Sequence, residues 1–227
     1  MGTVADVLSS CLVEAGIDTV YGLPGGETVE LLDSFRRNGI RFVLVHRECA
    51  AAFMACASAR LTGKPAVCLT TLGPGATNAV SGVAHAFLDR APILLITAQT
   101  PEQLLSRHTH QVVDLDALFK PITKASFALT AQDTAEMVRD ALALSMTGRP
   151  GPVHLRISNE EASWQAESGT GTIPRASFAP TSEQLEIARD LVGRSRRPVL
   201  LAGLGLEPER PYAELVQLAE SLRAPVI

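Results

Sequence analysis

Two loops rich in glycine and proline are the places where this chain could bring its backbone closest to a ligand. The first reads GLPGGE at residues 22–27, and the second reads TLGPGATN at residues 71–78. Glycine has no Cβ atom, so paired glycines allow close approach of a ligand to the main chain. Turn formation and close helix packing would explain either loop taken singly. The presence of both favours a binding site.

Neither loop matches a common nucleotide-binding motif. GPGATN lacks the GK[ST] ending of a Walker loop, and neither GLPGGE nor AGLGLEP at residues 202–208 supplies a complete GxGxxG pattern. Dinucleotide binding is therefore weakly supported, and the residues alone leave the ligand open.

Glu48 is the residue with the sharpest chemical interpretation. It follows the apolar run RFVLV at residues 41–45 and precedes CAAAFMACASA at residues 49–59, which contains no charged residue. Burial raises the pKa of a carboxyl group, which suits a group that donates a proton to a bound heterocycle. The alternative is a glutamate in the first turn of a helix, stabilised by the helix dipole. The residues alone favour neither.

The elements that must position these residues alternate along the chain. Short β-branched runs predict strands, and longer segments of helical period predict helices between them. The expected strands are 19–21, 41–45, 66–70, 93–97 and 153–157, and the expected helices are 4–15, 28–38, 49–62, 77–88 and 134–147. The strands are nearly all apolar, as in sheets covered on both faces. The sequence predicts an α/β fold with an open, doubly wound parallel sheet and helices on both faces.

Irregular segments follow four successive strands of this predicted sheet: GLPGGE, HRE at residues 46–48, TLGPGATN, and AQTP at residues 98–101. Ligands of open parallel sheets bind outside the carboxyl ends of the strands. We therefore expect one site at that edge.

Composition narrows the class of protein. The net charge is −4 and no run of Lys or Arg occurs, which argues against nucleic acid or an anionic membrane as partner. No apolar segment approaches the roughly 20 residues of a membrane-spanning helix, and no signal peptide is recognised, so a cytoplasmic location is expected.

The four cysteines, Cys11, Cys49, Cys56 and Cys68, show no CxxC spacing. We interpret them as small apolar core residues rather than metal ligands, with Cys49 and Cys56 on one face of a helix.

The amino-acid composition changes after residue 158. A polar stretch rich in Gly, Ser, Thr and Pro predicts a linker at 161–181 between a first domain of 1–160 and a second α/β domain of 182–227. In the second domain we expect a helix capped at Thr181 or Ser182 and ending near 194, a strand and turn within 198–210, and a helix at 212–222. The closing APVI at residues 224–227 looks like the opening of another strand. These pieces are too few to bury a core, so the second domain is expected to be truncated.

Several motifs, in the same order, resemble those of the thiamine-diphosphate-dependent enzymes, and among them the acetolactate synthase-like group. They are GLPGG, the Arg47-Glu48 pair, TLGPGATN, AFLDRAPILLITAQTP at 86–101, and TGRPGPVHLRI at 147–157. The resemblance implies that residues 1–160 form the domain binding the aminopyrimidine ring of the cofactor, called PYR, and that the remainder begins a central domain.

The resemblance also implies the chemistry. In this family the matching glutamate, here Glu48, hydrogen-bonds N1′ of the aminopyrimidine and so activates the thiazolium for attack on a small-molecule 2-oxo acid. The implied activity is that of a decarboxylase or carboligase, a lyase or transferase in which the cofactor carries the hard chemistry. The residues implied to lie at the cofactor are Pro24, Gly25, Gly26, Glu48, Thr71, Pro74 and Asn78.

One family motif is absent from these residues, the GDG-and-asparagine motif that holds magnesium and the diphosphate. We therefore expect no metal ligand here, no turnover by these residues alone, and weak cofactor binding. The family implies that the full-length protein uses magnesium and is a homodimer or homotetramer, because its sites form between subunits. The alternative is a non-catalytic cofactor-binding or regulatory protein of the same fold.

The substrate residues depart from the family pattern. Arg47 stands where the family usually has histidine, and His110 stands where acetolactate synthases usually have phenylalanine before the glutamine, here Gln111. His110 and Gln111 are the expected substrate residues, with His108 as a second histidine of a proton-shuttling pair. The alternative is an exposed loop with solvated histidines.

Overall fold

The computed structural model describes residues 2–107, 110–167, 179–206 and 211–227. The chain divides into two compact units, residues 1–176 and residues 177–227.

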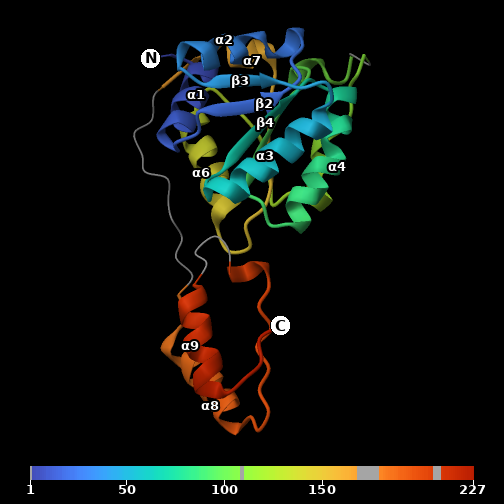
Figure 1. The fold of residues 1–227 in the computed structure, drawn as a ribbon. Coiled ribbons are helices and arrows are strands. Elements are labelled where there is room, and N and C mark those ends of the chain that lie inside the picture. Colours follow the sequence, from blue (N-terminus) through green and yellow to red (C-terminus); the bar gives the residue numbers. More distant parts are fainter. Residues whose placement is uncertain (1, 108–109, 168–178, 207–210) are drawn as a thin grey trace. The chain divides into compact units, whose positions relative to one another are not determined.

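The first unit is built on a six-stranded parallel sheet with the strand order β3-β2-β4-β5-β7-β6 (Figure 1). Its strands are β2 (Thr19–Gly22), β3 (Arg41–Leu44), β4 (Ala66–Thr70), β5 (Ile93–Ala98), β6 (Ser126–Ala128) and β7 (Val153–Ile157). The predicted parallel sheet and its five expected strands are confirmed. The sequence did not indicate β6, because a three-residue strand is too short to show a period.

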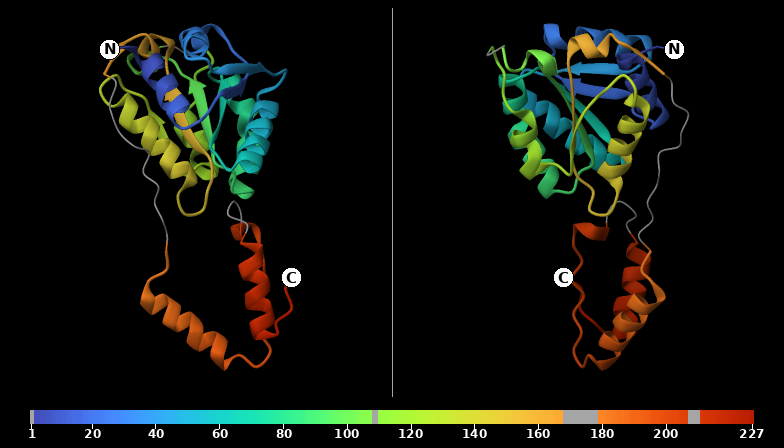
Figure 2. Two further views of the ribbon diagram at one scale, coloured as in Figure 1. Left: turned by 60° about the vertical axis from the view of Figure 1, so that its left-hand side comes forward. Right: turned by 180° about the vertical axis from the view of Figure 1, so that it is seen from behind.

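Helices cover both faces of the sheet, as the views in Figures 1 and 2 show. One face packs against α1 (Val4–Glu14), α2 (Val29–Arg37) and α6 (Thr134–Met146), and the other against α3 (Glu48–Thr62), α4 (Pro74–Leu88) and α5 (Leu115–Phe119). Successive strand residues face opposite sides, so Val67 and Leu69 of β4 enter the first core and Cys68 enters the second. The doubly wound α/β class predicted from the sequence is thus confirmed.

Short elements complete the first unit. β1 (Gly2–Thr3) pairs antiparallel with β8 (Gln165–Ala166), and α7 (Asn159–Ala162) precedes β8. Three short 3-10 segments, Gly26–Thr28, Glu102–Leu104 and Lys120–Ile122, lie in connections. The pairing of β1 with β8 places residues 165–166 in the first unit.

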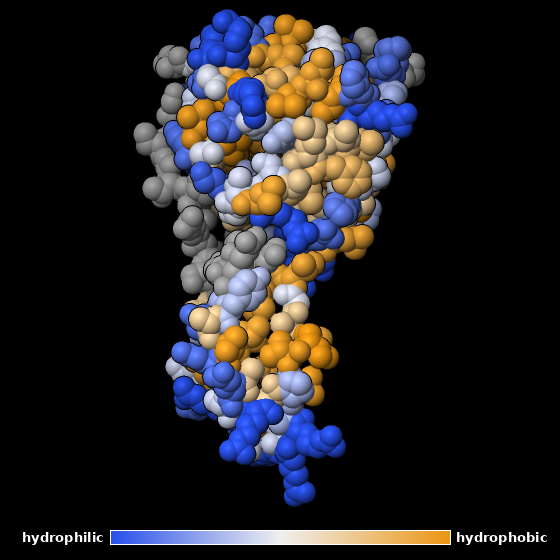
Figure 3. Space-filling view, viewed as in Figure 1, coloured by the Kyte–Doolittle hydropathy of each residue, from blue (hydrophilic) through white to orange (hydrophobic). Residues whose placement is uncertain are grey.

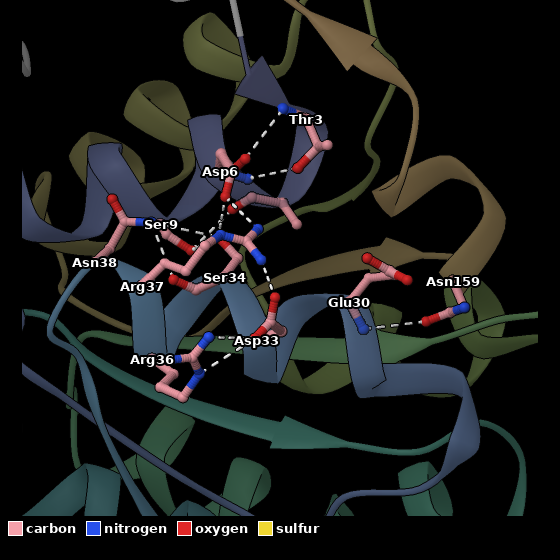
Figure 4. A network of polar contacts seen from close by, with 11 residues as sticks. Thr3, Asp6, Ser9, Glu30, Asp33, Ser34, Arg36, Arg37, Asn38 and Asn159 are labelled. Carbon is pink, nitrogen blue, oxygen red and sulfur yellow. Dashed lines mark hydrogen bonds and ion pairs between the residues drawn. The ribbon is translucent and has the colours of Figure 1, made fainter.

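A polar network joins α1 to α2 and so fixes the helix that follows the first glycine-rich loop (Figure 4). The Asp6 carboxylate accepts hydrogen bonds from Arg37 at 2.7 Å and from Ser34 at 2.9 Å. Ser34 also bonds to the hydroxyl of Ser9 at 2.8 Å. Burial alone would raise the pKa of Asp6, but the bonds from Arg37, Ser34 and Thr3 outweigh it and lower that pKa to about 2.

The second unit contains α8 (Ser182–Arg194), α9 (Tyr212–Leu222) and the 3-10 segment Leu204–Leu206. The predicted cap is confirmed, since the Thr181 hydroxyl accepts from the Gln184 backbone N–H at 3.2 Å. The two expected strands form only an isolated parallel bridge between Leu200 and Val226. That prediction was wrong in extent, because the described residues offer neither segment a further strand to pair with.

Three of the four cysteines are buried, as expected of core residues, but Cys49 is half-buried. Burial raises the pKa of the Cys68 thiol to about 12, so this cysteine acts as an apolar side chain.

Among the described residues, no helix is both long and apolar enough to cross a membrane.

Candidate functional site

The two glycine-rich loops meet at the carboxyl edge of the sheet. A Cβ atom added at Gly25 would lie 2.5 Å from Cγ2 of Thr71, well inside van der Waals contact. β2 and β4 are neighbouring parallel strands, so the loops that follow them leave the sheet side by side. The predicted convergence of residues 22–27 and 71–78 is therefore present in the structure.

Glu48 is the first residue of α3, directly after the short connection from β3 at residues 45–47, and only 5% of its surface is exposed. The amide nitrogen of Asn78 on α4 donates a hydrogen bond of 3.1 Å to its Oε2 atom. The carboxyl group is thus buried, and it also lies in the first turn of a helix, where the dipole favours an acidic side chain. Its role in proton transfer stays a prediction.

At Gly75, the backbone of the second loop lies close to both the Thr71 hydroxyl and the Glu48 carboxyl group. A Cβ atom at this position would lie 2.1 Å from Oγ1 of Thr71 and 3.3 Å from Oε1 of Glu48. No larger residue fits without displacing Thr71. Glu48 and Thr71 thus border one bare stretch of backbone from two βα connections, β3–α3 and β4–α4, and Asn78 of α4 binds the same Glu48 carboxyl group.

The helix after the second loop begins three residues earlier than predicted. α4 starts at Pro74, where the fixed φ of proline suits the first helical position, rather than at residue 77. Gly73 precedes it with φ +51° and ψ −112°, a conformation that favours glycine. The earlier start places Pro74, which is exposed, and Asn78 one turn apart on the same helix.

Gln111 lies against this turn. A Cβ atom at Gly73 would lie 2.1 Å from the backbone oxygen of Gln111, which itself has φ +57°. His110 and Gln111 are both exposed, and His108 lies outside the described residues. The structure therefore brings Gln111 to the edge of the site, while the role of the histidines stays a prediction.

The remaining cofactor candidates differ in their surroundings. Pro24 is half-buried, whereas Gly26 is exposed and has open space where a Cβ atom would be. Of the paired glycines in the first loop, Gly25 is therefore the one that must lack a side chain for steric reasons.

Three residues that position the site were missed from the sequence. Gly73 and Gly75 flank Pro74 and need glycine for the contacts above. Thr28 is fully buried and hydrogen-bonds to Gly25. The sequence holds no signal that separates Thr28 from an ordinary cap at the start of a helix.

The family described as "Thiamine pyrophosphate enzyme, N-terminal TPP binding domain" matches residues 2–118, just over half of the chain. This chain belongs to that family. The match spans both glycine-rich loops, Glu48 and Gln111. The resemblance deduced from the motifs is confirmed.

The relatives of this chain include proteins named as acetolactate synthases and one named as a probable decarboxylase. A probable acetolactate synthase large subunit of Methanocaldococcus jannaschii is 33% identical over 98% of this chain and 39% of its own length. The chloroplastic acetolactate synthase of Arabidopsis thaliana is 35% identical over 88% of this chain and 31% of its own length. A probable 2-ketoarginine decarboxylase of Pseudomonas aeruginosa is 35% identical over 99% of this chain and 41% of its own length. The chain spans less than half the length of each of these relatives.

A solved structure shares the fold. The thiamine diphosphate-dependent 4-hydroxybenzoylformate decarboxylase of Rhodococcus jostii superposes with a TM-score of 0.89 at 24% identity, over 99% of this chain and 44% of that one. Its arrangement of helices about a parallel sheet is that of the first unit.

Proposed function

We propose that the complete protein containing this chain is a thiamine-diphosphate-dependent decarboxylase or carboligase of 2-oxo acids, of the acetolactate synthase type. In this proposal the chain binds the aminopyrimidine ring. The observation that carries it is the buried carboxyl group of Glu48, held by Asn78 beside the bare backbone of Gly75.

The residues present fit such a ring. In this proposal the aminopyrimidine ring is bound by a carboxyl group at one ring nitrogen and by main chain without side chains against its edge. Glu48 supplies the first, and the glycines on either side of Thr71, Gly25 and Gly75, supply the second. Glu48 then holds or transfers a proton at a carboxyl oxygen, and Asn78 sets the direction in which that oxygen points.

The other residues of the site have binding roles in this proposal. Pro24, Gly25 and Gly26 approach the cofactor from the first loop, and Thr71 and Pro74 from the second. When bound, thiamine diphosphate supplies the nucleophilic carbon that attacks the 2-oxo group and accepts the electrons released with carbon dioxide. Gln111 and His110 contact the 2-oxo acid.

The diphosphate and its magnesium ion are bound by a domain outside residues 1–227 in this proposal, and the working protein is a homodimer or homotetramer. Apolar side chains gather on the surface over α3 and α4 (Figure 3). The exposed apolar residues of these helices include Phe53, Met54 and Leu88. An apolar surface beside the site supports a subunit contact there. Residues 1–227 alone are expected to show no turnover and to bind the cofactor weakly. Calorimetry that showed tight, magnesium-dependent binding to them would contradict this part.

The test of the function is Glu48→Gln in the complete protein, measured as carbon dioxide release from a panel of 2-oxo acids that begins with pyruvate. Loss of a positioned proton-transfer group lowers kcat by about 100-fold or more. Glu136→Gln, an exposed change on α6 across the sheet, is the matched control and should leave the rate unchanged. A Glu48→Gln enzyme with the rate of the control would refute the proposed function.

A further inference from the structure

The residue that holds the first glycine-rich loop in place is Thr28. Its side chain is fully buried. Its hydroxyl accepts a hydrogen bond from the Gly25 N–H at 3.1 Å and donates one to the Gly25 carbonyl oxygen at 3.0 Å. The backbone N–H of Thr28 donates a further bond to the same oxygen at 3.1 Å. Three hydrogen bonds therefore join these two residues.

The conformation of Gly25 explains how one hydroxyl reaches both of its polar groups. Gly25 has φ −141° and ψ −175°, which is extended backbone. In a fully extended residue, the N–H and the carbonyl oxygen point to the same side. The Thr28 hydroxyl bridges the two and stabilises this conformation against others that glycine adopts easily.

The fixed residue is the one that contacts the second loop. Gly25 lies so close to Thr71 that a Cβ atom would be 2.5 Å from its methyl group. Gly26, the next residue, has open space around it. A change in the conformation of Gly25 would therefore alter the distance between the two loops.

Thr28 also links the first glycine-rich loop to a helix that is itself held in place. It is the last residue of the 3-10 segment Gly26–Thr28 and directly precedes α2. α2 is bound to α1 through Ser34 and Arg37, which both donate to Asp6. The hydroxyl of Thr28 thus connects an anchored helix to a loop of glycines.

We propose that Thr28 is a positioning residue of the cofactor site, whose hydroxyl keeps Gly25 extended against Thr71. This inference rests on the proposed function, since the ligand of the loop is thiamine diphosphate there. Thr28 acts through Gly25 and does not itself contact the cofactor.

Two variants of the complete protein test it. Thr28→Val keeps the shape of the side chain and removes its hydrogen bonds, whereas Thr28→Ser keeps the hydroxyl and removes the buried methyl group. We expect Thr28→Val to raise the Kd of thiamine diphosphate about tenfold, as for loss of one or two hydrogen bonds, and Thr28→Ser to stay within about threefold of wild type. A residue important only for packing would show the opposite order.

A second measurement does not depend on the cofactor. Amide hydrogen exchange of residues 22–28 in the unliganded protein should be at least about tenfold faster in Thr28→Val than in Thr28→Ser, with the exchange of β4 unchanged. Should the valine variant not fold, Thr28→Ala, which also lacks the hydroxyl, replaces it with the same expectations.

The outcomes separate the two proposals. Tight binding by wild type with equal binding by Thr28→Val overturns this inference alone, as does equal exchange in the valine and serine variants. A wild-type protein that does not bind thiamine diphosphate overturns the proposed function, and the role of Thr28 in cofactor binding with it. Weak binding by Thr28→Val, restored by serine, supports both.

Discussion

The side chains of Glu48 and Asn78 are joined by a hydrogen bond of 3.1 Å between two helices that begin at the same edge of the sheet. Glu48 follows β3 and Asn78 follows β4, with β2 between these strands in the sheet. The bond therefore depends on the sheet order and not on closeness in the sequence. It fixes one carboxyl oxygen and leaves Oε1 turned toward Gly75.

Asn78→Ala should reduce catalysis without unfolding the protein. Loss of a hydrogen bond to a carboxyl group costs about 1.5 kcal/mol or more when that group is buried, equal to about tenfold in kcat/KM. Because Glu48 is buried, the free energy of unfolding should fall by a similar amount, which leaves a domain of ordinary stability folded. Ser81→Ala, an exposed change nearly one turn further along α4, is the control. Steady-state kinetics in the complete protein that did not distinguish the two variants would remove Asn78 from the site.

Gly25→Ala and Gly26→Ala should differ sharply although they are neighbours. The methyl group of the first would meet Thr71, at a cost of about 1–3 kcal/mol, while the second meets open space. Adding Thr71→Ser removes the contacting methyl group and should restore part of the loss in Gly25→Ala. Urea unfolding followed by the fluorescence of Trp164, the single tryptophan, measures the wild type, the two alanine variants and the double variant. Equal stability of the two alanine variants would show that the loops are not in close contact.

Sequence patterns predicted the sheet because each main strand is a nearly continuous apolar run, and the parallel order then requires loops to converge at one edge. These patterns did not locate elements in segments that lack a hydrophobic period. β6 has only three residues, and the start of α4 was placed at residue 77 because the glycines and Pro74 read as loop.

The residues of the candidate site could be named from the sequence, but their contacts could not. Glu48 is recognisable from its apolar flanks, whereas the bond from Asn78 and the approach of Gln111 to Gly73 depend on three-dimensional distances between distant segments. Thr28 was overlooked for a different reason. Its importance follows from its burial, which the sequence does not show, and a threonine at the start of a predicted helix is interpreted as an ordinary cap.

His154 should make stability depend on pH in the acidic range. Its ring is buried, with Nε2 2.9 Å from the Thr97 hydroxyl and Nδ1 2.6 Å from the Ser126 hydroxyl. Burial, aided by Arg156 and opposed by Asp116, lowers its pKa from 6.5 to about 4. The unfolded chain therefore binds more protons than the folded one between these values. Stability is full above pH 6.5 and falls as pH decreases toward 4, by up to about 3 kcal/mol.

The matched pair for this prediction is His154→Asn and His46→Asn. The first removes the buried titrating ring and should reduce the slope of unfolding free energy against pH between 4 and 6.5, whatever its stability at pH 7. The second removes an exposed histidine and should leave the slope as in wild type. An unchanged slope in His154→Asn would mean that the buried ring does not govern this range.

Asp6 should act in a separate and lower pH window. Its folded pKa of about 2 lies below the ordinary value of 3.8, so the carboxylate contributes stability above pH 3.8 that is lost as pH falls toward 2. Asp6 and Arg37 are both partly exposed, with 30% and 41% of their side-chain surfaces accessible, so solvent screening limits the contribution to about 1 kcal/mol. Asp6→Asn should flatten the stability profile between pH 2 and 4, whereas Asp140→Asn, an exposed change on α6, should not. The same measurement at about 1 M salt should shrink the difference, because a partly exposed ion pair is screened. A profile that is identical for both variants would show that the bonds to Arg37 and Ser34 do not hold α1 and α2 together.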